Sequence, residues 1–221
     1  MKSRGVKPKG NIKIKWTPEF AYVIGLIAAD GCLSSNCTHV TFVSKDIEQV
    51  RNFKTLLKIE NTIGKNFSGI NRRLSYRIQF GDVVFGSFLR RIGITPAKSN
   101  TIGELKIPKK YFFDFLRGSF DGDGTFYSYW DKRWKSSFMF YTEFVSASKG
   151  HVVWIQKEIY NRLGVSGHIT KSKNNSCYQL KYAKADSLKI LKKMYYKSEL
   201  VCLNRKRLKI IKVLAIVGEK L

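Results

Sequence analysis

The sequence predicts an α+β fold made of two similar halves, each with the element order αββαββα. Two apolar stretches with a central glycine, 22–31 and 114–124, end on an acidic residue followed by glycine. The segments after the two stretches match one another in order. Within them, short runs of alternating apolar residues predict strands, and apolar residues at helical spacing predict helices. A duplicated unit explains all three observations.

The two halves align at an offset that changes once. Gly25 and Asp30 correspond to Gly118 and Asp123, each 93 positions further along. Two later segment pairs match at an offset of 102, namely 41–57 with 143–159 and 75–80 with 177–182. The second half therefore holds about nine additional residues between its apolar stretch and its second strand.

Each half has the same order of elements. The apolar stretch predicts a short helix, which the following glycine ends. Next come a strand pair, an amphipathic helix, a second strand pair and a closing helix. In order, these elements are predicted at 32–44, 45–59, 65–80 and 82–93 in the first half, and at 125–146, 149–164, 167–182 and 185–196 in the second. We divide the chain into a basic arm 1–17, a first half 18–95, a linker 96–107, a second half 108–200 and a basic tail 201–221.

The charge of the chain indicates a polyanionic partner. Forty-one Lys and Arg against 16 Asp and Glu give a formal net charge of +25 at pH 7. Self-repulsion of this size is relieved when nucleic acid neutralises it. A solvated basic surface or an anionic membrane would be the alternatives. The basic residues are spread along the chain, and no run of 18 apolar residues occurs, which disfavours a membrane.

The cysteines and the first residues bear on the compartment. The four cysteines, Cys32, Cys37, Cys177 and Cys202, form no CxxC pair, so we expect no zinc site and a reducing environment. The basic N-terminus has no apolar core of the kind that a secretory signal carries. We therefore expect a location in the cytoplasm of a bacterium or phage host, or in an organellar matrix.

The predicted strands carry one apolar and one polar face. In the segment 75–80, Tyr76, Ile78 and Phe80 alternate with polar residues, and 177–182 repeats the pattern. A polar strand face with Arg, Gln, Lys and Ser suits base edges in the major groove, which admits a two-stranded ribbon. An ordinary solvated face is the alternative, which the net charge disfavours.

The acidic residues at the ends of the two apolar helices require a joint explanation. Gly25 and Gly118 lie five positions before Asp30 and Asp123, on the apolar face of each helix. Without side chains, these glycines allow close helix packing, which would bring both C-terminal ends side by side. Two carboxylates there repel each other and meet the negative end of each helix dipole. Divalent cations such as Mg²⁺ would stabilise the pair and could support phosphodiester hydrolysis.

The motifs VIGLIAADG (23–31) and LRGSFDGDG (116–124) resemble those of the single-chain LAGLIDADG homing endonucleases. The SKD after the second strand, the PAKS in the linker and the basic tail are similar to that family as well. The first motif departs from the family pattern at Ala28, where the second has Asp121. Both motifs keep Asp30 and Asp123, the residues that match the metal ligands of the family.

The resemblance implies a fold and an activity. Each half would place a saddle-shaped four-stranded antiparallel sheet in the major groove of a long, asymmetric DNA site, with the motif helices joining the halves. A monomer would cut both strands with short 3′ overhangs, using Mg²⁺, for which Mn²⁺ or Ca²⁺ can substitute in binding. Lys45 matches the basic accessory residue of the family, which implies a catalytic role. The alternative is that Lys45 is an ordinary surface lysine. Its counterpart is Ala147, so we expect unequal strand cleavage or a neighbouring basic substitute.

The polar strand faces and the basic tail give the expected DNA contacts. They are Ser34, Asn36, His39, Thr41, Asn66, Ser68, Arg72, Arg73, Ser75, Arg77, Gln79, Tyr127, Tyr129, Arg133, Lys135, His168, Thr170, Lys171, Gln179, Lys181 and Lys206. A non-cleaving DNA-binding protein on the same scaffold and an intron RNA maturase are the alternative functions. An intein is not expected, because the sequence has no flanking Cys and no terminal His-Asn for splicing.

Overall fold

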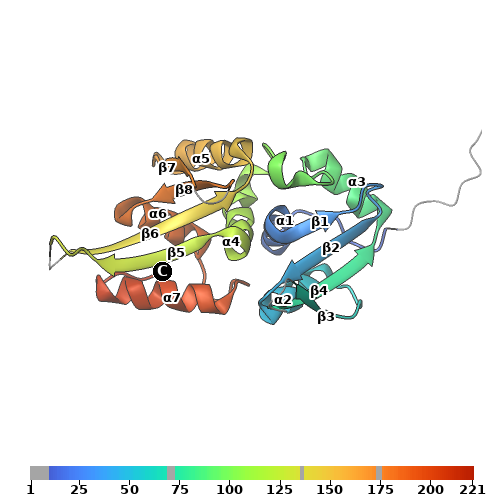
Figure 1. The fold of residues 1–221 in the computed structure, drawn as a ribbon, viewed down its shortest axis with the longest axis horizontal. Helices are drawn as coiled ribbons and strands as arrows, with labels where there is room; N and C mark the ends of the chain where they lie inside the picture. The colour runs from blue at the N-terminus through green and yellow to red at the C-terminus, as the bar shows by residue number, and fades with distance from the viewer. Residues whose placement is uncertain (1–9, 69–72, 135–136, 173–175) are drawn as a thin grey trace, which may run out of the picture.

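The computed structural model describes residues 10–68, 73–134, 137–172 and 176–221, and it contains two related halves side by side (Figure 1). The first half comprises α1 Pro18–Asp30, β1 Gly31–Leu33, β2 His39–Ser44, α2 Ile47–Leu57, β3 Gly64–Ser68, β4 Arg73–Gly81 and α3 Val83–Ile92. The second comprises α4 Phe112–Asp123, β5 Thr125–Trp130, β6 Phe138–Ser146, α5 Lys149–Leu163, β7 His168–Lys171, β8 Tyr178–Tyr182 and α6 Lys184–Met194. The predicted α+β fold with two αββαββα units is confirmed.

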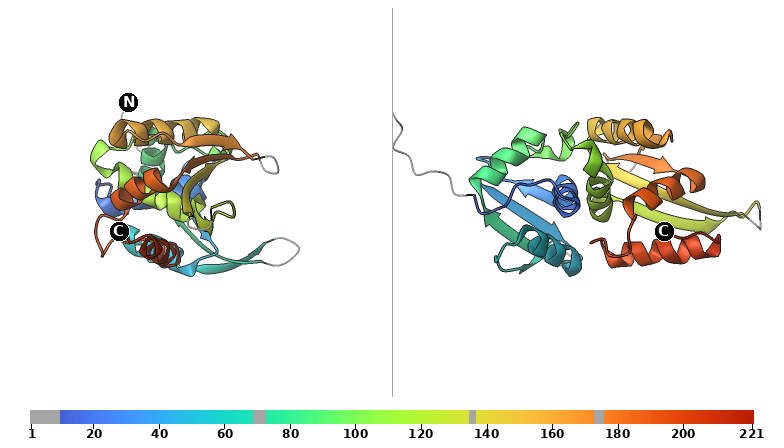
Figure 2. Two further views of the ribbon diagram at one scale, coloured as in Figure 1. Left: turned by 90° about the vertical axis from the view of Figure 1, so that its left-hand side faces the viewer. Right: turned by 180° about the vertical axis from the view of Figure 1, so that it is seen from behind.

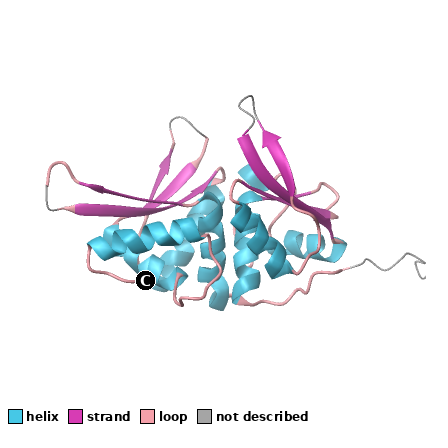
Figure 3. Ribbon diagram, turned by 90° about the horizontal axis from the view of Figure 1, so that it is seen from below, coloured by secondary structure: helices cyan, strands magenta, loops and turns pink. Residues whose placement is uncertain are grey.

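Each half contains a four-stranded antiparallel sheet. The strand orders are β1-β2-β4-β3 and β5-β6-β8-β7, which are equivalent under the repeat. Thr41 pairs with Gln79 in the first sheet, and Glu143 pairs with Lys181 in the second, at the offset of 102 that the sequence predicts. The sheets lie on one side of the molecule and the helices on the other (Figure 3). Each sheet thus has a helix-covered face and an open face.

Local capping sets where the first helices begin. Pro18 opens α1, and the Thr17 hydroxyl accepts a hydrogen bond from the Phe20 amide at 3.1 Å. Asp82 caps α3 in the same way, at 2.7 Å from the Phe85 amide. The second carboxylate oxygen of Asp82 accepts from the amides of Asn11 and Ile12. Residues 11 and 12 of the predicted basic arm are therefore held on the first half rather than extended from it.

The two halves meet at α1 and α4, which lie against each other at the centre of the molecule (Figure 1). Gly25 and Gly118 lie at the contact. A Cβ on Gly25 would lie 2.1 Å from the Phe115 carbonyl oxygen, and one on Gly118 would lie 2.0 Å from that of Tyr22. No side chain fits in either place, so the helix backbones themselves touch.

The segments outside the repeats are ordered against this centre. The predicted linker contains the short 3₁₀ helix η1 Lys98–Asn100, and the tail contains α7 Asn204–Ile216. A second 3₁₀ turn, η2 Lys109–Tyr111, precedes α4. The helix α7 runs along the second half on the side opposite α5 (Figures 1 and 2). Among the described residues, no helix has the length and apolar character to cross a bilayer.

Candidate metal site and nucleic-acid interface

Asp30 and Asp123 are the last residues of α1 and α4, and helix packing brings the two helix ends together. A Cβ on Gly122 would lie 3.0 Å from Oδ2 of Asp30, so the first carboxylate reaches the residue before the second. The structure therefore places the two acidic residues at one seam between the halves. We call this seam, with Asp30, Asp123 and the backbone of Gly122, the carboxylate seam.

The carboxylate seam disfavours two negative charges. Burial, together with the charge of Asp123, raises the pKa of Asp30 to about 7. The pKa of Asp123 is raised as well, mainly because the carboxylate loses hydration at the seam. Both groups also lie at the negative end of a helix dipole. The folded protein therefore favours a proton or a cation at this position over two bare carboxylates.

Two partly or fully buried lysines flank the carboxylates. Lys98 is 6% exposed, and its amine donates to the Ala29 carbonyl at the end of α1 at 3.2 Å. The positive charges of Lys98 and Lys206 act on both Asp30 and Asp123 and partly offset the rise of their pKa values. Burial in turn lowers the pKa of Lys98 and brings that of Lys206 to about 8.

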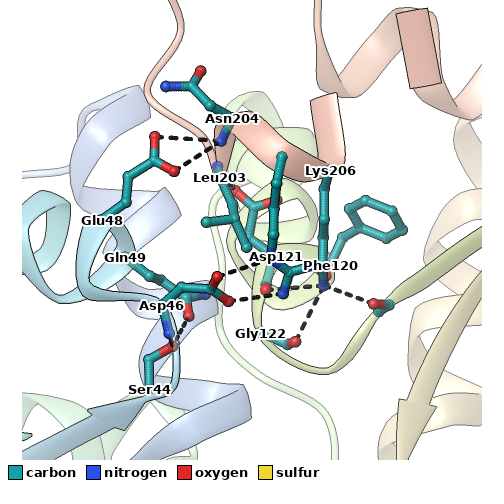
Figure 4. A network of polar contacts seen from close by, with 12 residues as sticks. Ser44, Asp46, Glu48, Gln49, Phe120, Asp121, Gly122, Leu203, Asn204 and Lys206 are labelled. Carbon is teal, nitrogen blue, oxygen red and sulfur yellow. Dashed lines mark hydrogen bonds and ion pairs between the residues drawn. The ribbon is translucent and has the colours of Figure 1, made fainter. Parts of the chain in front are cut away.

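Lys206 has a different place from the predicted one. Its amine donates to the carbonyl oxygens of Phe120, Asp121, Gly122 and Gly124 at 2.6 to 3.2 Å, as Figure 4 shows in part. The end of α4 engages this amine in the structure, and its contact with DNA phosphate stays a prediction. A lysine here neutralises the carbonyl end of the helix and supplies positive charge beside Asp123.

Lys45 follows β2 and is exposed. It lines a cleft together with Asp30, Asp121 and Gly122, so it faces the carboxylate seam. The neighbouring Asp46 forms an ion pair with Arg205 of α7, with contacts of 2.7 and 2.8 Å. This hydrogen bonding lowers the pKa of Asp46. The pair ties the tail of the second half to the first half at the edge of the cleft.

Asp121 has a structural role that Ala28 cannot have in the first half. Its side chain is 1% exposed and accepts a hydrogen bond from the Tyr22 hydroxyl at 2.9 Å. It also accepts one from the Leu203 amide at 2.7 Å (Figure 4). Burial raises its pKa to about 6. Asp121 thus joins α1, α4 and the start of the tail. The tail follows only the second half, which explains why only the second motif needs this carboxylate.

The donor set fits hard divalent cations. Two carboxylates on adjacent helix ends supply the oxygen ligands that Mg²⁺ prefers, and their mutual repulsion favours a bound cation. Within the described ranges, no group of three or more His, Cys, Asp or Glu side chains could form a self-contained metal site. Further ligands would have to come from backbone oxygens, water or a substrate phosphate.

The open face of the first sheet is polar. Opposite residues of β2 and β4 place Thr41, Arg77 and Gln79 on this face. The Thr41 hydroxyl donates to the Gln79 side-chain oxygen at 3.3 Å, and Arg77 donates to the same atom. His39 and Arg73 are exposed on the same face. Asn66 and Ser68 of β3 also lie on this face, because they pair with Ser75 and Arg73 of β4.

Three predicted contacts in the first half have other surroundings. Ser75 lies on the open face but is only 7% exposed, and its hydroxyl donates to the Asn66 carbonyl at 3.2 Å. Ser34 and Asn36 shape the turn between β1 and β2. The Ser34 hydroxyl donates to the Asn36 side-chain oxygen at 2.7 Å and accepts from the amides of Thr38 and His39.

The open face of the second sheet holds most of its predicted contacts. His168 pairs with Lys181 and Thr170 with Gln179, which places all four on this face, together with Tyr127 and Tyr129 of β5. Lys171, which is also a predicted contact, lies on the opposite face of this strand. It pairs with Tyr178 on the helix-covered face, with its amine 5.8 Å from the tyrosine ring centroid. Arg133 lies in the β5–β6 turn, bound to Asp131. Arg72 and Lys135 lie outside the described residues.

The raised pKa of Asp30 predicts how stability depends on pH. The folded state holds the Asp30 proton up to about pH 7, whereas the unfolded chain releases it near 3.8. Stability therefore falls as pH rises between these values. We expect Asp30→Asn to stabilise the protein in EDTA by about 2–3 kcal/mol more at pH 8 than at pH 4.5, or about 5–10 °C in Tm. Thermal denaturation at both pH values measures this, and an equal gain at both would contradict it.

The sequence matches no protein-family model, and no curated protein resembles it significantly. Several solved structures, however, are similar to it in fold. The DNA-bound meganuclease I-SmaMI has a TM-score of 0.60 at 12% identity, with 92% of each chain covered. I-DmoI in complex with DNA and Mn has a TM-score of 0.53 at 16% identity, covering 83% of this chain and 98% of that one. Full-length DUF199/WhiA from Thermatoga maritima has a TM-score of 0.54 at 15% identity, covering 94% of this chain and 70% of that one.

These similarities extend over most of the chain and bear on its architecture. The neighbours include LAGLIDADG homing endonucleases and the LAGLIDADG domain of DUF199/WhiA. At such low identity, structural similarity establishes the fold and leaves the chemistry to the site. The predicted resemblance is therefore confirmed, and the chain has the LAGLIDADG fold.

Proposed function

We propose that the protein is a site-specific DNA endonuclease that hydrolyses phosphodiester bonds in both strands with divalent cations held by Asp30 and Asp123. The observation that carries the proposal is the carboxylate seam. Two related helices, α1 and α4, end there with acidic residues beside Lys98 and Lys206, at the contact between the two halves. Two negative carboxylates so close together repel each other, and a bound cation that also contacts a substrate phosphate would relieve this repulsion.

The surfaces around the seam support DNA as the substrate. The chain has a formal net charge of +25, and both sheets offer polar side chains on their open faces. I-SmaMI and I-LtrWI, which have the same fold, are described in DNA-bound structures. Because the two open faces differ in chemistry, we propose a long, asymmetric target. From the resemblance to the LAGLIDADG homing endonucleases, we propose that it is cut with short 3′ overhangs.

The residues of the carboxylate seam have distinct roles in this proposal. Asp30 and Asp123 would hold Mg²⁺, which activates water and stabilises the leaving oxygen when bound. The amines of Lys98 and Lys206 add fixed positive charge where charge develops on a phosphate. Lys45, on the first half only, faces the same cleft and would contact the phosphate or its hydration. Lys98 and Lys206 are thus the proposed basic groups that replace a lysine at Ala147.

The remaining features of the proposal follow from the two-half architecture. One chain supplies both carboxylates, so we propose a monomer that needs no protein partner for cleavage. Mg²⁺ is the proposed cation, with Mn²⁺ or Ca²⁺ able to support binding. The four cysteines are free thiols in the structure, so we propose a reducing compartment that contains DNA, such as a bacterial cytoplasm or an organellar matrix.

A cleavage selection tests the proposed function. The protein is incubated with a randomised duplex library and Mg²⁺, and the ends of cut molecules are captured and sequenced, with an EDTA reaction as the control. Enrichment of one site with staggered ends, only in Mg²⁺, supports the endonuclease. Enrichment of bound but uncut duplex would indicate a DNA-binding protein without cleavage. Preference for structured RNA over every duplex would indicate a maturase.

The lysines of the carboxylate seam are expected to contribute to the rate. Lys98→Met should lower single-turnover cleavage of the selected site by about 10²-fold, the usual loss when one charge-stabilising donor is removed. DNA affinity should change by less than about threefold, because this one charge is small beside the basic surface. Separate nicking rates for each strand, with Lys157→Met on α5 as the control, measure the effect. Lys98→Met cleaving as fast as Lys157→Met would contradict this role.

A further inference from the structure

The open face of the second sheet carries a row of stacked tyrosines. Tyr127 and Tyr141 are cross-strand partners whose rings lie 5.3 Å apart at 17°. Tyr129 stacks on the same Tyr141 ring at 6.1 Å and 9°. We call Tyr127, Tyr129 and Tyr141 the tyrosine ladder. Parallel rings in contact hold one another in place, so the ladder is a rigid surface.

The ladder is exposed where the sheet faces away from the helices. Tyr129 is 44% exposed, and Met139, its partner on β6, extends the apolar surface. The core of the second half is on the other face, where Phe126, Phe140 and Phe144 are at most 4% exposed. The ladder therefore adds nothing to the core, and an exposed aromatic patch of this kind marks a binding surface.

The equivalent positions of the first sheet are polar. At the repeat offsets of 93 and 102, Tyr127 and Tyr141 correspond to Ser34 and His39. The Ser34 amide donates to the His39 carbonyl at 2.9 Å, so these two residues lie opposite each other in the first hairpin. Tyr127 and Tyr141 lie opposite each other in the same way in the second hairpin. Tyr129 corresponds to Asn36 in the turn. The two halves thus place different chemistry at the same point of the same scaffold.

Charge beside the ladder is already neutralised. Lys181 forms an ion pair of 2.7 Å with Glu143, and its amine lies 5.6 Å from the Tyr127 ring centroid. The Tyr127 hydroxyl donates to the Glu143 carboxylate at 3.3 Å. Because Glu143 already pairs with Lys181, this lysine attracts phosphate less strongly, and this part of the face is suited to bases. An apolar, uncharged surface in the major groove recognises the C5 methyl group of thymine.

From this geometry we propose that the tyrosine ladder makes the second sheet specific for a thymine-rich half-site, through apolar contact with thymine methyl groups. This inference rests on the proposed function, since it requires the open faces to lie in the major groove of DNA. The first sheet, where Arg77 and Gln79 occupy the face, would recognise its half-site by hydrogen bonds instead.

Replacing thymidine by deoxyuridine tests the ladder directly, because it removes only the methyl group. The site is first selected from the randomised duplex library in Mg²⁺. Selection repeated with Gln79→Ala identifies the first half-site, whose base preference it should relax. Duplexes with deoxyuridine in one half-site or the other are then compared by fluorescence anisotropy in Ca²⁺.

The expected results separate the ladder from general binding. Each thymine replaced in the second half-site should lower the affinity by about threefold to fivefold, the value of one buried methyl group. Replacement in the first half-site should change it by less than about twofold. Tyr129→Ala should lose the same factor on the thymine duplex and become insensitive to deoxyuridine at the thymine that Tyr129 contacts, while the other positions stay sensitive. Tyr129→Phe should bind as the parent does, and Tyr160→Ala on α5 is the matched exposed control.

Cross-strand tyrosines also stabilise hairpins, and the thymine duplexes distinguish this role. A purely structural ladder would give Tyr129→Ala the same fold loss on thymine and deoxyuridine duplexes, which would overturn the proposal. A selected second half-site without thymine enrichment would overturn it as well and leave the proposed function standing. If no duplex is enriched at all, the proposed function and the ladder's role fail together.

Discussion

Asp30→Asn and Asp123→Asn are each expected to lower the cleavage rate by at least about 10³-fold on the selected DNA site. Asparagine keeps the shape and one oxygen of the side chain but removes the charge that attracts a divalent cation. The two carboxylates come from different helices, and the charge of Asp123 raises the proton affinity of Asp30, so neither can replace the other. Single-turnover cleavage in Mg²⁺ measures both rates.

DNA binding by the same variants is expected to persist and to strengthen slightly in EDTA. Each variant removes a negative charge that would face the phosphate backbone. Asp186→Asn, which changes a carboxylate on α6, is the control and should cleave as the parent does. Cleavage by Asp30→Asn or Asp123→Asn at the rate of this control would show that the seam does not hold the reacting metal.

The sequence was sufficient to predict the fold and the position of the acidic pair. The helices that end at Asp30 and Asp123 are recognised by local pattern, and the repeat predicts that they are equivalent by pseudo-symmetry. Pairing at offsets of 93 and 102 also holds in the sheet registers, where Cys32 pairs with Thr41 and Thr125 with Glu143. Properties that depend on local spacing and on symmetry can therefore be predicted from the residues alone.

The basic groups of the site could not be predicted in the same way. Lys98 and Lys206 lie outside the repeated units, in segments that reach the helix ends only through tertiary packing. A signal was present, since each lysine follows the closing helix of its half, in the linker or in the tail. Among 41 basic residues, however, sequence alone does not distinguish a lysine that caps a helix from one in solvent.

Strand faces also depend on register, which short segments specify weakly. Lys171 follows Thr170, and a strand alternates its side chains, so both cannot lie on the same face. The pairing of His168 with Lys181 decides which of them joins the open face. Buried polar roles escape prediction for a related reason. Asp121 occupies a motif position that differs between the halves, and its role depends on the Leu203 amide, which is 82 residues away in the chain.

Gly118→Ala is expected to destabilise the protein by at least about 3 kcal/mol, or about 6–12 °C in Tm. The new Cβ would lie 2.0 Å from the Tyr22 carbonyl oxygen and 3.1 Å from the Gly25 Cα, both backbone atoms that cannot rotate away. The helices α1 and α4 would have to separate, which opens the core on both sides of the seam. Gly25→Ala should act in the same way, because its Cβ would lie 2.1 Å from the Phe115 carbonyl oxygen.

Gly150→Ala provides the matched control, because Gly150 is also helical but a Cβ there would lie no closer than 3.8 Å to its nearest neighbour, the Ser148 hydroxyl oxygen. Replacing a helical glycine by alanine without a clash stabilises a protein by about 0.5–1 kcal/mol. Gly150→Ala should therefore raise the free energy of unfolding, whereas Gly118→Ala lowers it. Chemical denaturation of both variants measures this. Equal stability of Gly118→Ala and Gly150→Ala would mean that α1 and α4 can separate without cost. In that case the packing of these helices would not hold Asp30 and Asp123 together, and the cation site would need another support.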